Sequence, residues 1–186
     1  MRVTPTSLPG VMIVEPQVFG DERGFFLESF NSVRFAEHGL PPHFGQDNHS
    51  RSRRNVLRGL HYQLRSPQGK LVTVVRGEVF DVAVDIRRGS PTFGRWFGTV
   101  LREDEHRFVF IPPGFAHGFC VLSDSADFVY KCTSLYDADD DRGVLWSDPA
   151  IGVEWPVTDP QLSSKDCLYL PLNADRDDLP NYVTQP

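Results

Sequence analysis

The sequence predicts an all-β protein, a barrel or sandwich of short strands, and three observations carry this prediction. The 186 residues include 15 Gly and 15 Pro, so turn signals are frequent. Aromatic residues make up 12% of the chain, with 14 Phe, and they recur beside β-branched residues in short runs. Only one run, residues 32–38, has the pattern of a helix. We therefore expect a single domain over residues 1–186, with a barrel core at about 43–135 and a loop-rich C-terminal segment, 136–186, wrapped around it.

The expected strands are short apolar, aromatic or β-branched segments separated by turn residues. The clearest is 78–86, in which the even-numbered residues from Phe80 to Ile86 are apolar while Asp81 and Asp85 occupy the other face. The helix at 32–38 has Asn31 or Ser32 as its N-cap and Gly39 as its stop. The predicted strands are residues 11–14, 25–30, 55–63, 70–76, 78–86, 95–101, 108–111, 117–122 and 127–134.

Charge and composition argue against several classes of function. Acidic residues outnumber basic ones 25 to 19, for a net charge of -6, so nucleic acid is not expected as the main partner. No apolar run approaches the about 18 residues of a membrane span, and the N-terminus lacks the layout of a signal peptide. Three widely spaced cysteines indicate neither a disulfide framework nor a metal site. We expect a soluble, cytoplasmic protein.

One predicted strand carries charge where apolar residues are expected. Arg58-Gly59-Leu60-His61 places a guanidinium and an imidazole in the same short segment, and buried charge is costly unless it is paired or binds a ligand. Strict alternation would put Arg58 and His61 on opposite faces of the strand. Both can reach one pocket only if the strand bulges at Gly59 or ends near it.

A second motif resembles a signature of the cupin superfamily. Residues 112–119 have the spacing P-x-G-x-x-H, with Gly114 in a turn and His117 pointing into the barrel. The first cupin signature would carry H-x-H, but Tyr62 and Gln63 follow His61 here. One histidine per signature is too few for a firm Fe, Mn or Zn site. We therefore expect a cupin-type double-stranded β-helix (a jelly-roll barrel) without metal or cofactor.

Without a metal, the chemistry would depend on protonatable side chains. Tyr130 shares a strand face with Phe128 and Cys132, so its hydroxyl is expected to point inward. Lys70 opens a strand at the barrel mouth, and Asp166 lies in the C-terminal segment. Each also has an ordinary structural interpretation, as a core tyrosine, a surface lysine and a capping aspartate.

In combination, these motifs resemble the dTDP-4-dehydrorhamnose 3,5-epimerase family. The resemblance runs in order from about residue 3 to about residue 172; each motif alone is weak, but the ordered set is specific. The matching segments are residues 19–26, 46–50, 56–63, 69–72, 77–85, 113–119, 130–131, 155–156 and 162–166.

The resemblance implies a set of catalytic roles. The family's substrate, dTDP-4-dehydro-6-deoxy-D-glucose, has a C4 ketone that acidifies the hydrogens on C3 and C5. Epimerisation therefore needs a base, a cation for the enolate and an acid on the opposite face. By the resemblance, His61 is the base and Asp166 the carboxylate that orients it, as in a triad. Lys70 would hold the O4 oxyanion, and Tyr130 would return the proton.

Binding roles are implied in the same way. Arg23 and Arg58 would grip the pyrophosphate with forked guanidinium groups, and Phe19 could stack on the thymine. The other implied contacts to nucleotide or sugar are Glu28, Gln46, Asp47, Asn48, His117, Asp141 and Lys165. Asp141 stands where the family usually has Glu, in an acidic run whose alignment could slip by one residue. The resemblance also implies a homodimer with exchanged strands.

Three alternatives remain open on the sequence. A mono-epimerase acting only at C3 or C5 would keep the same residues. A metal-dependent cupin oxygenase or isomerase is disfavoured by the missing H-x-H. A non-catalytic sugar-nucleotide binding module would tolerate the loss of His61 and Tyr130, yet both are present together with Lys70 and Asp166.

Overall fold

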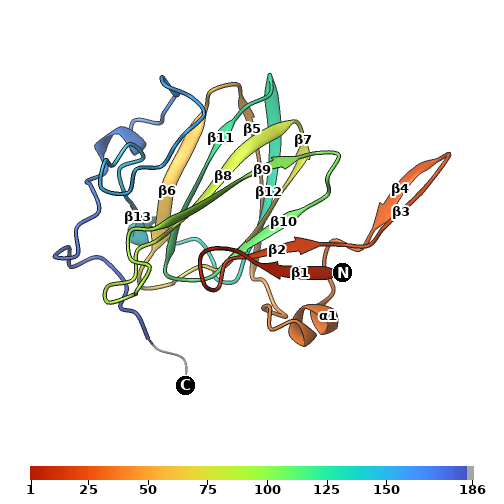
Figure 1. Ribbon diagram of the computed structural model, residues 1–186, viewed down its shortest axis with the longest axis horizontal. Helices are drawn as coiled ribbons and strands as arrows, with labels where there is room; N and C mark the ends of the chain where they lie inside the picture. The colour runs from red at the N-terminus through yellow and green to blue at the C-terminus, as the bar shows by residue number, and fades with distance from the viewer. Residues whose placement is uncertain (184–186) are drawn as a thin grey trace.

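Two antiparallel sheets face each other and form a jelly-roll barrel in the computed structural model, which describes residues 1–183 (Figure 1). The six-stranded sheet has the order β1-β2-β10-β7-β12-β5, and the five-stranded sheet has the order β13-β6-β11-β8-β9. The strands are β1 (Arg2–Pro5), β2 (Met12–Glu15), β3 (Val18–Asp21), β4 (Gly24–Leu27), β5 (Gln46–Arg53), β6 (Leu57–Gln63), β7 (Lys70–Arg76), β8 (Glu78–Asp85), β9 (Trp96–Arg102), β10 (Phe108–Ile111), β11 (Phe115–Val121), β12 (Ser125–Cys132) and β13 (Asp141–Gly143). The predicted all-β class is confirmed.

The main core lies between the two sheets. Val72 and Phe128 from the six-stranded sheet pack in one cluster with Ala83 and Phe119 from the five-stranded sheet. Every residue of β11 is buried, because the C-terminal segment covers the outer face of its sheet. Figure 1 shows the part of this segment that follows β13 in blue, alongside β6 and β13. Apolar burial on both faces therefore holds the five-stranded sheet between the core and the C-terminal segment.

A hairpin formed by β3 and β4 projects away from the barrel (Figure 1). Its aromatic residues are open to solvent: Phe19 is 60% exposed and Phe26 is 68% exposed. Phe25, close to the turn of the hairpin, has its ring centroid 4.2 Å from that of His106, in the loop between β9 and β10. The hairpin therefore presents an apolar surface that residues 1–183 leave exposed.

All nine predicted strands overlap an observed strand, but β1, β3, β5 and β13 were not predicted. The most consequential omission is β5, which has no apolar residue. Its outward-facing residues are paired with β12 by Arg51–Asp127 and Asp47–Lys131 ion pairs, at 2.6 and 2.8 Å. Cross-strand charge pairs and a polar cavity thus replace the apolar alternation on which strand prediction depends.

The predicted helix is confirmed as α1 (Ser32–Glu37). The Asn31 side chain accepts hydrogen bonds from the backbone N–H groups of Val33 and Arg34, which identifies Asn31 as the N-cap. The buried residue of α1, Phe35, packs edge-on against Phe30. No helix within residues 1–183 is long and apolar enough to cross a membrane.

Of the two ways in which Arg58 and His61 could reach one pocket, a bulge at Gly59 or a strand end near it, the structure has the bulge. His61 lies opposite His117 and Arg58 lies opposite Phe119, so β6 has one residue more than β11 between these pairs. Gly59 has φ +138°, and a Cβ there would lie 2.5 Å from the Cα of Gly118. The bulge therefore requires glycine and lets Arg58 and His61 both line the barrel interior.

We expect Gly59→Ala to lower the free energy of unfolding by about 2–4 kcal/mol, because the methyl group would meet backbone and the positive φ would be strained. The melting temperature should fall by about 5–15 °C in a chain of this size. Gly89→Ala is the matched control, since Gly89 has φ +81° but a Cβ there would meet no atom within 4 Å. Equal Tm losses in both variants would contradict the packing argument.

Candidate active site

A cavity with two adjoining lobes, of about 290 and 320 Å³, lies inside the barrel. The lobes share the side chains of His61, Lys70, Tyr130, Tyr136 and Asp141. The first lobe is further lined by Gln46, Asn48, Tyr62, Gln63, Gln68 and Cys132, and the second by Ser50, Arg58, His117, Phe119, Phe128 and Lys165. Most of the expected site residues therefore meet in one place.

His61 is held by a carboxylate from the C-terminal segment. Asp166, the first residue of the short 3-10 helix η2 (Asp166–Leu168), is 2% exposed, and its Oδ1 lies 2.5 Å from His61 Nε2. Burial alone would raise the pKa of Asp166, but the hydrogen bond and charge of His61, with help from Ser163, hold it below its ordinary value. The carboxylate is therefore ionised and accepts a hydrogen bond from the Nε2–H group of His61. This bond fixes the tautomer and orientation of the imidazole.

Lys70 begins β7 on the opposite sheet, beside Cys132 of β12. Burial lowers the pKa of its amine below the usual 10.5, an effect that the nearby Cys132 and Asp141 partly oppose. Within residues 1–183, no carboxylate forms an ion pair with its amine. Lys70 thus presents its amine to the cavity, where no acidic side chain of residues 1–183 forms an ion pair with it.

Tyr130 faces the cavity from β12, as predicted, with Phe128 and Cys132 on the same strand face. Burial raises the pKa of its hydroxyl above the ordinary 10.0, and the nearby Arg58 charge opposes this only in part. The phenol therefore remains protonated at neutral pH and can donate a proton into the cavity.

A second histidine–aspartate pair lies beside the first. His117 Nε2 is 2.7 Å from Oδ2 of Asp81 on β8, and both side chains are buried. His61 and His117 are direct partners across β6 and β11. Alternation along residues 78–86 puts Asp81 on the face opposite the apolar residues of its strand, but Asp81 was not among the predicted site residues. The sequence feature that could have identified Asp81 is a carboxylate at a strand position that faces the barrel, because a buried carboxylate requires a partner.

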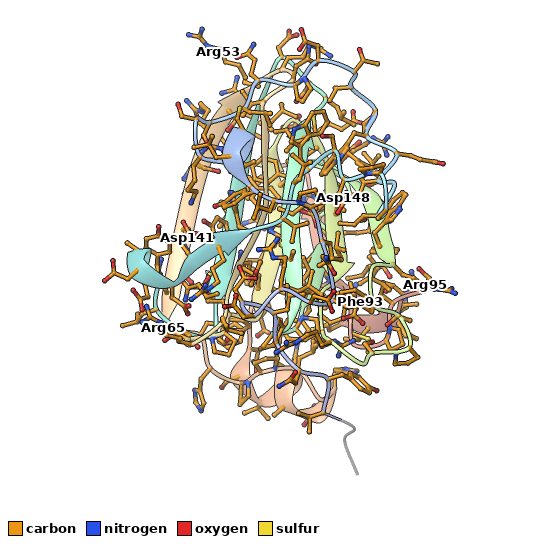
Figure 2. The ribbon with its side chains drawn as sticks, turned by 90° about the vertical axis from the view of Figure 1, so that its left-hand side faces the viewer. Arg53, Arg65, Phe93, Arg95, Asp141 and Asp148 are labelled. Atoms are coloured by element: carbon orange, nitrogen blue, oxygen red, sulfur yellow. The ribbon has the colours of Figure 1, made fainter. Side chains whose placement is uncertain are left out.

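Asp141, rather than its neighbour, is the acidic residue that faces the cavity. Its Oδ2 accepts a hydrogen bond from the Tyr136 hydroxyl at 2.9 Å and forms an ion pair with Lys165. Asp140 is fully buried and accepts hydrogen bonds from the backbone N–H groups of Arg65 and Ser66. Tyr136 was not among the predicted site residues. Figure 2 shows Asp141 at the edge of the face that the C-terminal segment covers.

The structure does not bring four of the expected residues into the cavity. Asp47 points out of the sheet toward Lys131, because alternate residues of β5 face opposite ways. Phe19 and Arg23 lie on the projecting hairpin, where Arg23 pairs with Asp21. Glu28 accepts a hydrogen bond from Arg34 of α1 at 3.0 Å. No cluster of three or more metal-ligating side chains occurs in the part of the chain that the structure describes.

Comparison with known proteins identifies the family. The model of the dTDP-4-dehydrorhamnose 3,5-epimerase family matches residues 5–174. The chain belongs to this family. It is 60% identical to the dTDP-4-dehydrorhamnose 3,5-epimerase of Shigella flexneri over 168 residues, which is 89% of this chain and 93% of the relative. It is also 43% identical to the dTDP-4-dehydrorhamnose 3-epimerase of Streptomyces niveus, over 99% of this chain and 91% of the relative.

The fold comparison agrees. The crystal structure of dTDP-6-deoxy-D-glucose-3,5-epimerase from Legionella pneumophila, in complex with dTDP-4-keto-L-rhamnose, superposes with a TM-score of 0.95 at 49% identity. The match covers 98% of this chain and 99% of the Legionella chain. Both the family resemblance read from the sequence and the predicted cupin-type jelly roll are therefore confirmed.

Proposed function

We propose that the chain converts dTDP-4-dehydro-6-deoxy-D-glucose to dTDP-4-dehydro-L-rhamnose by inverting C3 and C5. One observation carries this proposal: His61 and Tyr130 line the same cavity from opposite sheets, with Lys70 between the two lobes. Inversion requires a base on one face of the sugar and an acid on the other. The names of the relatives at 54–60% identity support the same reaction.

The geometry assigns each step to a side chain. His61, oriented by Asp166, removes the proton from the carbon next to the ketone. Lys70 stabilises the negative charge that develops on O4, where a cation already desolvated by the protein needs no reorganisation. Tyr130 then delivers a proton from the opposite face. His61 ends the step protonated and Tyr130 deprotonated, and exchange with water resets both before the second carbon reacts.

Substrate binding would combine groups from two chains. Arg58 lines the second lobe, and its Nε donates a hydrogen bond to Ser52 at 3.0 Å. The two terminal nitrogens of its guanidinium would then be available to bind the pyrophosphate. His117 and Lys165 line the same lobe, and Gln46 and Asn48 line the other. We propose a homodimer in which the hairpin of one subunit brings Phe19, Arg23 and Glu28 to the cavity of its partner. The exposed aromatic residues of the hairpin support this arrangement. A cytoplasmic role in dTDP-L-rhamnose supply for cell-surface glycans such as the O-antigen is consistent with this reaction.

A 3-epimerase is the second candidate. The 43% identity with the Streptomyces niveus 3-epimerase over nearly the whole chain favours it as the alternative. NMR in D₂O with dTDP-4-dehydro-6-deoxy-D-glucose, followed by reductase and NADPH to trap the product, tests both. Deuterium at C3 and C5 with dTDP-L-rhamnose formed would support the double epimerase, and deuterium at C3 alone would identify the 3-epimerase.

His61→Ala should reduce deuterium incorporation at both carbons by about 10²–10⁴-fold, because the same base serves both. Tyr130→Phe should retain incorporation at one or both carbons while product formation slows, because it lacks only the acid. The two rates are measured in the same NMR samples. Full product formation by either variant would overturn the role assigned to that residue.

The rate should fall at alkaline pH because Lys70 must stay charged. Burial lowers the pKa of this amine below 10.5, so its proton and its stabilisation of the enolate are lost at a lower pH than for an ordinary lysine. Lys70→Arg, which stays charged, should be slower but should lose this alkaline decline. The check is the pH profile of kcat/KM for both proteins. An unchanged decline in Lys70→Arg would assign it to another group.

The shared site can be tested by mixing two inactive variants. Arg23→Ala lacks the hairpin cation, and His61→Ala lacks the base. If the hairpin acts on the partner's cavity, refolding an equal mixture should create one intact site per mixed dimer and restore about a quarter of the wild-type rate. If each chain uses its own hairpin, the mixture should be no more active than its components.

A further inference from the structure

The guanidinium of Arg176 connects three parts of the chain behind the catalytic pair. Its Nη2 donates to the carbonyl of Gly143 at 3.1 Å and to the hydroxyl of Tyr62 at 3.2 Å. Its Nη1 donates to the carbonyl oxygens of Leu170 and Pro171, at 3.1 and 3.3 Å. Asp178 accepts from Nε and Nη2 at 2.8 and 2.7 Å and neutralises the charge. This side chain is only 14% exposed.

Each of these contacts lies next to a residue of the site. Tyr62 follows His61 in β6, and Gly143 of β13 is the register partner of His61. Leu170 directly follows Tyr169, whose ring packs edge-on against His61 with centroids 5.8 Å apart. Asp166 lies four residues before Leu170, and the two are joined by η2. The guanidinium therefore ties the strand that carries His61 to the segment that carries Asp166.

The packing around these contacts leaves little room for adjustment. A Cβ on Gly143 would lie 2.3 Å from the ring of Tyr169, so this ring already touches the β13 backbone. Among residues 1–183, the buried Tyr169 hydroxyl has no hydrogen-bond partner. The Tyr169 ring is therefore held by close packing against the backbone of β13. Arg176 bonds both to that backbone, at Gly143, and to Leu170, the residue after Tyr169.

We propose that Arg176 is a positioning residue. It holds the part of the C-terminal segment that follows β13 against β6 and β13, so that Asp166 stays in hydrogen-bond contact with His61. The proposal rests on the proposed function for its effect on catalysis, although the His61–Asp166 contact can be observed without substrate. Arg176 lies beyond residues 5–174, the part of the chain that the family model matches. Its role is inferred from the contacts of its own guanidinium.

The first test is proton NMR of the free protein. Short histidine–carboxylate hydrogen bonds give low-field N–H signals. Residues 1–183 contain two such bonds, and their signals are assigned with His61→Ala and His117→Ala variants. Arg176→Ala should shift or abolish the His61 signal and leave the His117 signal unchanged. The His117–Asp81 pair thus reports on the fold of the barrel within the same sample.

The second test measures catalysis. Arg176→Ala should lower kcat by about 10- to 100-fold with a smaller change in KM, because the base is misplaced while the binding groups remain. In the Asp166→Asn background the same change should cost little, because the contact it protects is already lost. Millimolar guanidinium should restore part of the Arg176→Ala rate.

Arg102→Ala is the matched control. Arg102 pairs with Glu78 and Glu105 at the edge strand β9 and contacts no part of the cavity. It should lower stability somewhat without changing the His61 signal or the kcat. If Arg176→Ala does not fold, Arg176→Lys and Tyr62→Phe weaken the same contacts and are judged by the same signals.

The outcomes separate the two proposals. An unchanged His61 signal in a folded Arg176 variant, or an equal loss of kcat with and without Asp166, would overturn the positioning role. A wild-type protein that exchanges no proton of the sugar would instead overturn the proposed function. In that case the NMR comparison still decides whether Arg176 holds the pair together.

Discussion

The one extra residue in β6 is the constraint on which the site depends. Without it, Arg58 and His61 would face opposite sides of the strand, and the cavity would lose one of them. The bulge is possible because two glycines, Gly59 and Gly118, meet at backbone contact distance on adjacent strands. Sheet pairing continues on both sides of this point, so the irregularity redirects one side chain without weakening the barrel. The same strand can then supply both the proposed base and the proposed phosphate-binding cation.

Charge balance explains how so many ionisable groups share one barrel. Three carboxylates in or behind the cavity wall each have a basic partner: Asp166 has His61, Asp81 has His117, and Asp141 has Lys165. These pairs limit the cost of burial, since a buried charge without a partner strongly destabilises a fold. Lys70 differs, because no carboxylate within residues 1–183 pairs with it and burial lowers its pKa. The unneutralised cation thus stands where the proposed reaction would develop negative charge, which is the arrangement that electrostatic preorganisation requires.

The sequence predicted the fold class and the helix because these depend on local pattern: apolar alternation and cap residues. It offered a bulge at Gly59 as one of two alternatives, because this glycine lies between Arg58 and His61. It did not predict β5, whose partners Asp127 and Lys131 lie about 80 positions away in the chain. Asp47 was expected in the site with its neighbours because a sequence motif does not say which residues of a strand point inward. Asp81 and Tyr136 were missed for a related reason, since only the folded barrel brings them beside His117 and Asp141.

The C-terminal segment has the composition of an appendage, yet it supplies the carboxylate of the His61–Asp166 pair. A loop can orient a base only if it is as rigid as the strand that carries the base. Here Leu179 and Ile151 bury apolar surface on the outside of the sheet, and the Arg176 guanidinium holds the backbone closer to the site. Apolar burial is non-directional, so it keeps the segment attached without fixing its register. The directional bonds of the guanidinium supply that register, and the position of Asp166 beside His61 follows from both.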